Sequence, residues 1–280
     1  MKVPDPGFAV VDADGSLRWQ ARLWRMAAQR VALEARGLRY MAPLWTFARA
    51  SRVLASLGPP LVFLGTGDFH HLAYHLIRRK AREPLTVLVF DRHLDGQPGI
   101  PGFVTCGSWL GKVVRLPRVR QVVVAAAEAA AEGQGAAAAP RSGDGSTGAK
   151  LLVVPPQRVV QVRGELPEEF SLLFPTRKVY VSIDKDVLRE ARTTWGSGPL
   201  VMSDLARWLS WLRRSRELVG ADVCGELVPR SPWPDDREML AIRTNEALNL
   251  LLYRVLAGLS VRAARGAGLI SPRGRGRAAG

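Results

Sequence analysis

Short apolar runs alternate along this chain with segments in which apolar residues recur every three or four positions. Seven runs of four to eight residues are predicted to be strands: residues 8–12, 61–65, 85–90, 119–126, 151–154, 178–183 and 221–227. Continuous apolar and β-branched runs of this length are typical of strands that are buried on both faces. The pattern therefore predicts a mainly parallel sheet with helices on both sides.

Four segments have the periodicity or the start signals of helices. Residues 17–35 carry apolar side chains at helical spacing, which predicts an amphipathic helix. A second helix should contain HHLAYHLIRRK, residues 70–80, and Ser203 is expected to cap the start of a third. A long final helix is predicted over about 236–264, because residues 235–238 form a capping-box-like start.

The alternation of strands and helices predicts one α/β domain over residues 1–270. Residues 128–148, with the sequence EAAAEGQGAAAAPRSGDGSTG, are low in complexity and are expected to form a flexible surface insertion. The tail SPRGRGRAAG, residues 271–280, is rich in Arg and Gly and is expected to be disordered.

The strongly basic composition does not by itself indicate nucleic-acid binding. The chain has 280 residues, of which 47% are hydrophobic, and a formal net charge of +15. Its cations, 34 Arg and 6 Lys, are scattered over the whole sequence, which we attribute to coding bias. No RNP, zinc-finger or P-loop pattern accompanies them. We therefore expect no specific nucleic-acid partner.

The sequence is that expected of a cytoplasmic protein. The N-terminus lacks the charged-then-apolar layout of a signal peptide. The longest apolar runs fall short of the roughly 20 residues of a membrane span, so no membrane partner is expected. Cys106 and Cys224 lie far apart in sequence and do not have the spacing of a metal site.

Residues that commonly bind metals gather at the ends of four predicted strands. Residues 61–65 run into GTGDFHH, residues 85–90 into DRHLD and residues 178–183 into DKD, while the strand 221–227 contains a glutamate near its end. The residues concerned are Asp68, His70, His71, Asp91, His93, Asp95, Asp184, Asp186 and Glu226. Because ligands of open parallel sheets bind beyond the carboxyl ends of the strands, these side chains should converge.

Bound cations explain this set better than independent turns do. Asp68 alone could be a turn residue, Asp95 precedes Gly96 as in many turns, and His71 and His75 fit an exposed helix face as well as a zinc pair. Carboxylates with imidazole and without thiolate suit Mn²⁺ or Fe²⁺, with Zn²⁺ and Co²⁺ as alternatives. Four carboxylates and two imidazoles exceed the needs of one ion and would serve two ions about 3.5–4 Å apart.

GTGDFHH, DRHLD, SIDKD and ELVP, in this order and at strand ends, resemble the signatures of the ureohydrolases: arginase, agmatinase and formiminoglutamase. The resemblance covers residues 61–229. It implies a three-layer αβα sandwich with a mainly parallel central sheet, two Mn²⁺ ions per chain and a metal-bridging hydroxide as nucleophile. Members of this family commonly form trimers or hexamers, so a homo-oligomer is compatible with the resemblance.

Position by position, the resemblance implies six metal ligands: His70, Asp91, His93, Asp95, Asp184 and Asp186. His71 is the alternative to His70, because Phe69 is inserted relative to the GGDHS-like segment of the family. Asp91 and Asp184 correspond to the carboxylates that bridge the two metals.

Glu226 corresponds to the carboxylate that binds the cationic group of the substrate, by a charge-assisted hydrogen bond. The alternative is a surface ion pair with Arg230. Several positions depart from the family. Arg92 replaces a small residue, Lys185 lies between two of the ligands, and the DP that usually follows SxDxD is missing. FVTCGSWLGK also lacks the proton-shuttling histidine of arginase, which argues against strict arginase activity.

The sequence therefore predicts a metal-dependent hydrolase of a C–N bond in a guanidino, amidino or amide-type small molecule. Two alternatives remain open. A deacetylase-like hydrolase would share the general fold but would use a single Asp/His/Asp zinc site. A catalytically weak metal- or ligand-binding protein would account for the missing DP and the missing shuttle histidine.

Overall fold

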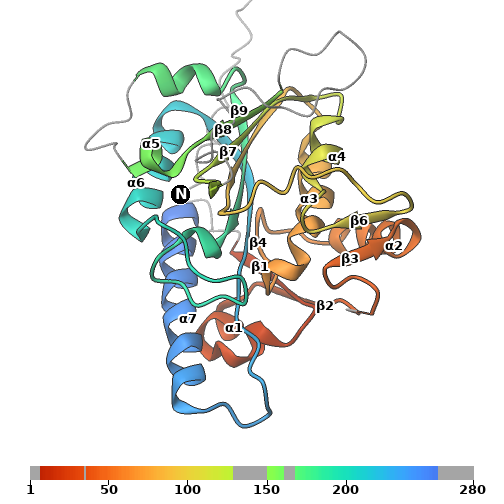
Figure 1. Ribbon diagram of the computed structural model, residues 1–280, viewed down its shortest axis with the longest axis vertical. Coiled ribbons are helices and arrows are strands. Elements are labelled where there is room, and N and C mark those ends of the chain that lie inside the picture. Colours follow the sequence, from red (N-terminus) through yellow and green to blue (C-terminus); the bar gives the residue numbers. More distant parts are fainter. Residues whose placement is uncertain (1–6, 35, 129–149, 161–167, 258–280) are drawn as a thin grey trace, which may run out of the picture.

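Eight parallel strands form the central sheet of the protein, for which a computed structural model describes residues 7–34, 36–128, 150–160 and 168–257 (Figure 1). The strands are β1 (Phe8–Asp12), β2 (Gln29–Ala32), β4 (Leu61–Phe63), β5 (Leu85–Phe90), β7 (Val119–Ala125), β8 (Leu151–Val154), β9 (Lys178–Asp184) and β10 (Glu217–Cys224). Their order in the sheet is β2-β1-β4-β10-β9-β5-β7-β8. A separate antiparallel pair consists of β3 (Met41–Pro43) and β6 (Phe103–Thr105).

Helices cover both faces of the sheet and so form the outer two of three layers (Figure 1). One face packs against α1 (Ala21–Met26), α5 (Pro156–Val160), α6 (Met202–Ser215) and α7 (Asp236–Ala257). The other face packs against α2 (Leu44–Ala55), α3 (Ala73–Lys80) and α4 (Leu110–Val114). Short 3₁₀ turns lie at η1 (Ser16–Trp19), η2 (Gly67–Leu72), η4 (Glu168–Leu173) and η5 (Lys185–Val187).

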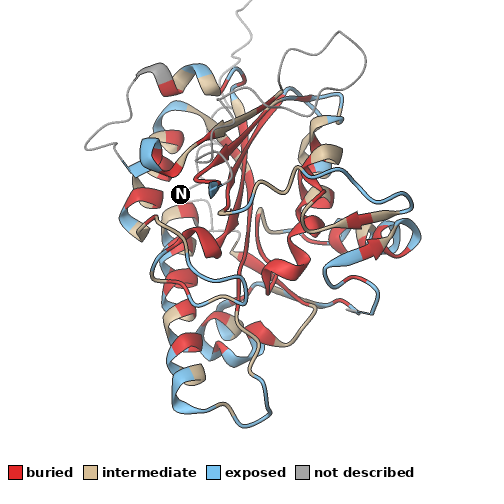
Figure 2. Cartoon of the chain, viewed as in Figure 1, coloured by how far each residue is buried: buried red, intermediate tan, exposed pale blue. Residues whose placement is uncertain are grey.

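The hydrophobic core divides into two parts, one on each face of the sheet. In β5, for example, Leu88 packs on the α6–α7 side, whereas Val87 and Val89 pack on the α2–α3 side. This follows from the alternation of side chains along a strand. The central strands are buried along their length, whereas the outer helices have exposed outward faces (Figure 2). The predicted mainly parallel three-layer α/β fold is confirmed.

All seven predicted strands are present, with some differences in their ends, but the predicted helix over residues 17–35 is wrong. That segment forms η1, then α1, then the edge strand β2, in which Val31 pairs with Val11 of β1. Pairing with a neighbouring strand overrides the local helical periodicity there. The last strand also ends earlier than predicted, at Cys224.

Of the two predicted helix caps, the one for α7 is confirmed and the one for α6 is wrong. Ser203 does not cap α6, which begins at Met202; instead the carboxylate of Asp204 accepts a hydrogen bond from the backbone N–H of Val201 (3.1 Å). The capping box of α7 is confirmed. The backbone N–H of Glu238 donates to Asp235 Oδ1 (2.8 Å), and the N–H of Asp235 donates to Glu238 Oε2 (3.3 Å).

Parts of three predictions lie outside the described residues. They are the insertion beyond residue 128, the tail 271–280 and the end of the final helix beyond residue 257. Within the described ranges, no helix combines the length and apolar character that crossing a membrane requires.

Candidate metal centre

The predicted site residues come from the ends of four strands that are adjacent in the middle of the sheet, in the order β4-β10-β9-β5. His70 lies in the η2 turn after β4, residues 91–95 follow β5, Asp184 ends β9, and residues 185–186 follow it. Cys224 ends β10. Parallel pairing brings these carboxyl ends to one edge, where open α/β sheets bind their ligands.

Six of the predicted residues form one group, which we call the acidic cluster: His70, Asp91, His93, Asp95, Asp184 and Asp186. His70 Nδ1 lies 3.1 Å from Asp91 Oδ2, 3.4 Å from Asp95 Oδ2 and 3.8 Å from Asp184 Oδ2. His93 Nδ1 lies 2.8 Å from Asp186 Oδ2 and 3.7 Å from Asp91 Oδ1. Asp91 is therefore shared between the two imidazoles.

A chain of hydrogen bonds holds the ring of His70 in one orientation. Its Nε2 lies 2.9 Å from Ser182 Oγ, and the Ser182 hydroxyl donates to Asp222 Oδ1 (2.9 Å). Because that hydroxyl proton is committed to Asp222, the Ser182 oxygen accepts the Nε2–H of His70. Nδ1 then faces the acidic cluster, buried and without a hydrogen-bond partner among the described residues. Metal-binding imidazoles are commonly oriented in this way through their other nitrogen.

Three of the four carboxylates in the cluster have raised pKa values. Burial also acts to raise the pKa of Asp91, but hydrogen bonds with His70 and His93 outweigh it and lower this pKa to about 2. Burial and the charge of Asp91 raise the pKa of Asp95 to about 7. The same two causes raise the pKa of Asp184, and burial with the charge of Asp184 raises that of Asp186 well above its usual value. Contacts with Asp186 and Asp91 raise the pKa of His93 to about 10. The cluster thus has an excess of negative charge that protons or cations must balance.

The donor set of the acidic cluster fits divalent metal ions. Possible ligand atoms of His70, Asp91 and Asp95 lie within 4.8 Å of one another, as do those of Asp91, His93 and Asp186. Two such groups that share Asp91 match the arrangement expected for two neighbouring ions. Carboxylate oxygen and imidazole nitrogen together are suited to Mn²⁺, Fe²⁺, Co²⁺ or Zn²⁺.

A cavity of about 310 Å³ opens onto the acidic cluster. Asp91, His93, Asp95 and Asp184 contribute to its lining, together with Trp195 and other residues. A Cβ atom on Gly67 would lie 2.7 Å from Asp184 Oδ2, so a glycine is required where η2 approaches this carboxylate. Cavities of this size suit small-molecule ligands.

Two tryptophans donate hydrogen bonds to acidic residues, of which Asp95 lines the cavity and Asp68 does not. Trp109 Nε1 donates to Asp95 Oδ2 (2.8 Å), and Trp195 Nε1 donates to Asp68 Oδ1 (2.8 Å). Asp68 also pairs with Arg39, whose Nε lies 2.8 Å from Oδ2. Asp68 therefore belongs to a hydrogen-bonded frame beside the acidic cluster.

Glu226 lies on the other side of β9, in a group that we call the lysine network: Lys185, Glu226, Gln20 and Asn249. One Glu226 oxygen, Oε1, accepts from the Lys185 ammonium and from Asn249 Nδ2 (2.7 Å), and the other, Oε2, accepts from Gln20 Nε2 (2.6 Å). Glu226 and Lys185 are both buried. Lys185 points away from the acidic cluster, as predicted, although η5 (Lys185–Val187) is a 3₁₀ turn and does not continue the strand.

The alternative partner predicted for Glu226 is wrong. Arg230 Nε lies 4.0 Å from Glu238 instead, and Glu226 is buried. Gly225, with φ of 90°, turns the chain after β10. A Cβ atom there would lie 2.5 Å from Asp184 Oδ1 and 2.7 Å from the backbone nitrogen of Lys185. This turn directs the Glu226 side chain to Lys185.

His71 and His75 lie apart from the acidic cluster, in an apolar layer. The ring of Phe47 is 5.8 Å from that of His71 and 4.1 Å from that of His75, measured between centroids. Both histidines are buried. Burial, followed by the charge of His70, lowers the pKa of His71 to about 3, and burial lowers that of His75 to about 4. Of the two adjacent candidates, His70 is the one that faces the carboxylates.

Sequence reasoning missed Ser182, Asp222, Cys224 and Trp109 as neighbours of the site. A usable signal existed for three of them. Ser182 precedes Asp184 by two positions in one strand, and Asp222 precedes Cys224 by two in another, so each pair shares a face. The contacts of Trp109 depend on the tertiary structure and have no comparable signal.

The chain is similar to an uncharacterized protein of Thermotoga maritima, with 30% identity over 252 residues that cover 90% of each chain. No protein-family model matches the sequence. Several solved structures share its fold. Proclavaminate amidino hydrolase from Streptomyces clavuligerus has 18% identity and a TM-score of 0.55, covering 91% of this chain and 94% of its own.

Formimidoylglutamase from Bacillus subtilis has 15% identity and a TM-score of 0.59, covering 92% of this chain and 88% of its own. Arginase from Bacillus caldovelox has 17% identity and a TM-score of 0.55, covering 87% of this chain and 97% of its own. The chain therefore belongs to one family with the Thermotoga maritima protein, and its fold is that of the ureohydrolases.

Proposed function

We propose that this chain is a hydrolase that uses two divalent metal ions to cleave a C–N bond in a guanidino, amidino or amide-type small molecule. One observation carries the proposal: four carboxylates and two imidazoles converge at the ends of adjacent strands, beside a cavity. The ureohydrolase fold and the order of the motifs support the same reaction class.

The residues of the acidic cluster have distinct roles in this proposal. Asp91 and Asp184 would be shared by the two ions, while His70, His93, Asp95 and Asp186 would complete their coordination. Two such ions, when bound, supply the Lewis acidity that activates water at neutral pH. Ser182 fixes the tautomer of His70, and Trp109 orients Asp95, so that the ligands are held in place before the substrate enters.

The role of Glu226 as the substrate-binding carboxylate stays a prediction. Both of its oxygens accept hydrogen bonds from side chains of this chain, and it is not among the residues that line the cavity. A substrate cation would have to take the place of the Lys185 ammonium. Glu226→Gln separates the two roles: a substrate clamp loses turnover at full metal content, whereas a structural partner of Lys185 loses stability.

The metal content of the purified protein is the first test. Protein stripped with a chelator and reconstituted with Mn²⁺ should hold two ions per chain and should then hydrolyse a member of a guanidino- and amidino-compound panel. Asp186→Asn should lower the metal content and abolish turnover. Asp235→Asn is the matched control, because Asp235 is exposed and lies outside the site and Asn can also cap the helix, so both properties should be unchanged.

One observation favours a second candidate, the deacetylase-like hydrolase. Asp91, His93 and Asp186 form an Asp/His/Asp group by themselves, which would suffice for one zinc ion. A single tightly held zinc per chain, together with turnover of an acetylated amine and none of the guanidino compounds, would replace the two-metal proposal with this one.

A further inference from the structure

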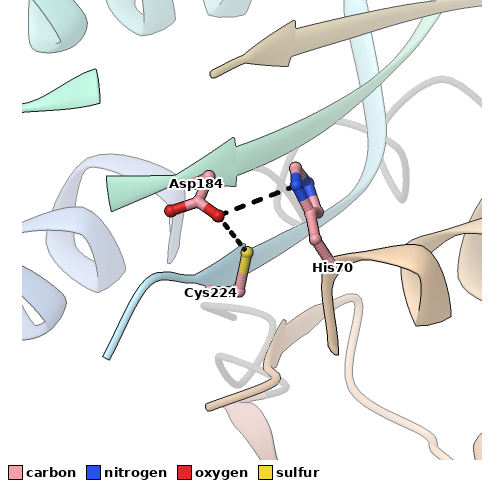
Figure 3. Close-up of side chains that lie close together, drawn as sticks. All are labelled: His70, Asp184 and Cys224. Atoms are coloured by element: carbon pink, nitrogen blue, oxygen red, sulfur yellow. Dashed lines mark hydrogen bonds and ion pairs between the residues drawn. The ribbon is translucent and has the colours of Figure 1, made fainter. Parts of the chain in front are cut away.

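A buried cysteine lies directly beside the acidic cluster. Cys224 and Asp184 end two adjacent parallel strands, β10 and β9, and are opposite each other in the strand register. Figure 3 shows one oxygen of Asp184 facing both the Cys224 sulfur and the His70 ring. The Cys224 Sγ is 3.3 Å from Asp184 Oδ2, and both residues are buried.

His70 completes a three-residue group with these two. The candidate ligand atoms of His70, Asp184 and Cys224 all lie within 4.8 Å of one another. His70 is 1% exposed, and its Nδ1 has no hydrogen-bond partner among the described residues. A thiolate about 2.3 Å and a carboxylate oxygen about 2.0 Å from one ion would lie about 3–3.5 Å apart. The observed separation of 3.3 Å is within that range.

We propose that Cys224 is a thiolate ligand of one of the two metal ions, together with His70 and Asp184. This inference rests on the proposed function, because it requires metal ions at the acidic cluster. When the sulfur–metal bond forms, the S–H bond breaks and its proton is released to solvent.

A thiolate ligand would make the two metal positions chemically unequal. Asp91, His93 and Asp186 offer only oxygen and nitrogen, which suit Mn²⁺. The position beside Cys224 would also have a soft sulfur ligand, which favours Zn²⁺, Co²⁺ or Fe²⁺ over Mn²⁺. The position beside Cys224 would then prefer a different metal from the position formed by Asp91, His93 and Asp186.

The alternative is that Cys224 is only a small core residue. It packs in the apolar core on the α2–α3 side, and buried thiols are common there. In that case the thiol would keep its proton and donate to Asp184 whether or not metal is present. The two roles differ in one observable, the presence of a sulfur–metal bond.

Titration of the chelator-treated protein with Co²⁺ tests the inference, because cobalt gives separate optical signals for binding and for thiolate ligation. Visible d–d bands report that Co²⁺ has bound, and a near-ultraviolet charge-transfer band reports a sulfur ligand. We expect both in the wild-type protein. Cys224→Ser should lose the charge-transfer band, keep d–d bands and bind the affected ion about tenfold or more weakly. Circular dichroism checks that the variant is folded.

Cys106→Ser is the matched control, since Cys106 lines the cavity but belongs to no candidate ligand group among the described residues. It should retain the charge-transfer band. Bound Co²⁺ without this band in the wild-type protein would overturn the role of Cys224 and leave the two-metal proposal standing. No binding of Co²⁺ at all would overturn both.

Discussion

Two buried polar groups lie on opposite sides of β9, and they differ in whether the chain balances their charge. Asp184 and Lys185 are consecutive residues, yet the first belongs to the acidic cluster and the second to the lysine network. In the lysine network a single ammonium faces a single carboxylate, whose remaining contacts come from two amide side chains. In the acidic cluster four carboxylates face two imidazoles.

This difference indicates which group needs partners from solution. A buried ion pair with satisfied hydrogen bonds is complete when the protein folds. A cluster of carboxylates with raised pKa values is complete only when cations or protons join it. One segment, SIDKD, supplies both groups: Asp184 ends β9, and the 3₁₀ turn η5 that follows places Asp186 in the acidic cluster and Lys185 in the lysine network.

Lys185→Met should have the largest effect on stability, because it leaves the Glu226 carboxylate buried without its cation. Removing one partner of a buried pair typically costs about 3–5 kcal/mol of unfolding free energy. Chemical denaturation monitored by circular dichroism would measure the loss. The metal content of the folded fraction should be unchanged, since the ammonium points away from the acidic cluster.

The double variant Lys185→Met, Glu226→Gln provides the control for that prediction. Its loss should be smaller than the sum of the two single losses by more than about 1 kcal/mol, because neither charge is then left unpaired. Additive losses would show that Lys185 and Glu226 do not stabilise each other, and the contrast between the two groups would fail.

Asp184→Asn should have the opposite effect from Lys185→Met: little change in the stability of the metal-free protein, but weaker stabilisation by metal. In the metal-free protein it removes a carboxyl that burial and Asp91 already disfavour in its charged form, so the unfolding free energy should change by less than about 1 kcal/mol. The difference should appear when metal is added. Wild-type protein at a free Mn²⁺ concentration 100-fold above Kd should gain about 2.7 kcal/mol per site, and the variant should gain less.

A large loss of stability in metal-free Asp184→Asn would contradict this expectation. It would show that the acidic cluster is stabilised by its own internal contacts, like the lysine network. Thermal unfolding in chelator and in Mn²⁺, carried out side by side, distinguishes the two cases.

His75→Phe should have the smallest effect, visible only as a change in pH dependence. The pKa of His75 is about 4 in the folded protein, below the unfolded value of about 6.5, so the unfolded chain takes up the proton first as the pH falls. The contribution of His75 to stability is therefore complete above pH 6.5 and is lost between pH 6.5 and about 4. Each pH unit in this window costs about 1.4 kcal/mol.

When the pH falls from 7 to 5, the unfolding free energy of the variant should decrease by about 2 kcal/mol less than that of the wild-type protein. Stability curves at the two pH values give the comparison, because the pKa of His71 in the folded wild-type protein, about 3, lies below this pH range. Equal losses in the two proteins would show that His75 is not held neutral in the apolar layer beside Phe47.

The central strands of the fold could be predicted because a buried parallel strand has a continuous apolar run. Residues 85–90 and 178–183 show this pattern, and both form strands. Residues 17–35 could not be predicted in the same way. Their helical spacing also suits a short helix followed by the edge strand β2, and pairing with β1 decides between the two.

The acidic cluster could be predicted from alternate ligand residues at strand ends. Residues that come next to the cluster only through the strand order could not be predicted, because β10 lies between β4 and β9 in the sheet but follows both in sequence. That order brings Cys224 to Asp184. The direction of the Glu226 side chain depends on the turn at Gly225, and no sequence pattern predicted this turn.

The central claim is that two metal ions occupy the acidic cluster. Anomalous diffraction from a crystal grown with Mn²⁺ tests it most directly. We expect two strong peaks per chain, one in contact with His70 and the other with His93, with Asp91 between them, and no peak at the lysine network. A single peak, or two peaks away from these carboxylates, would contradict the claim.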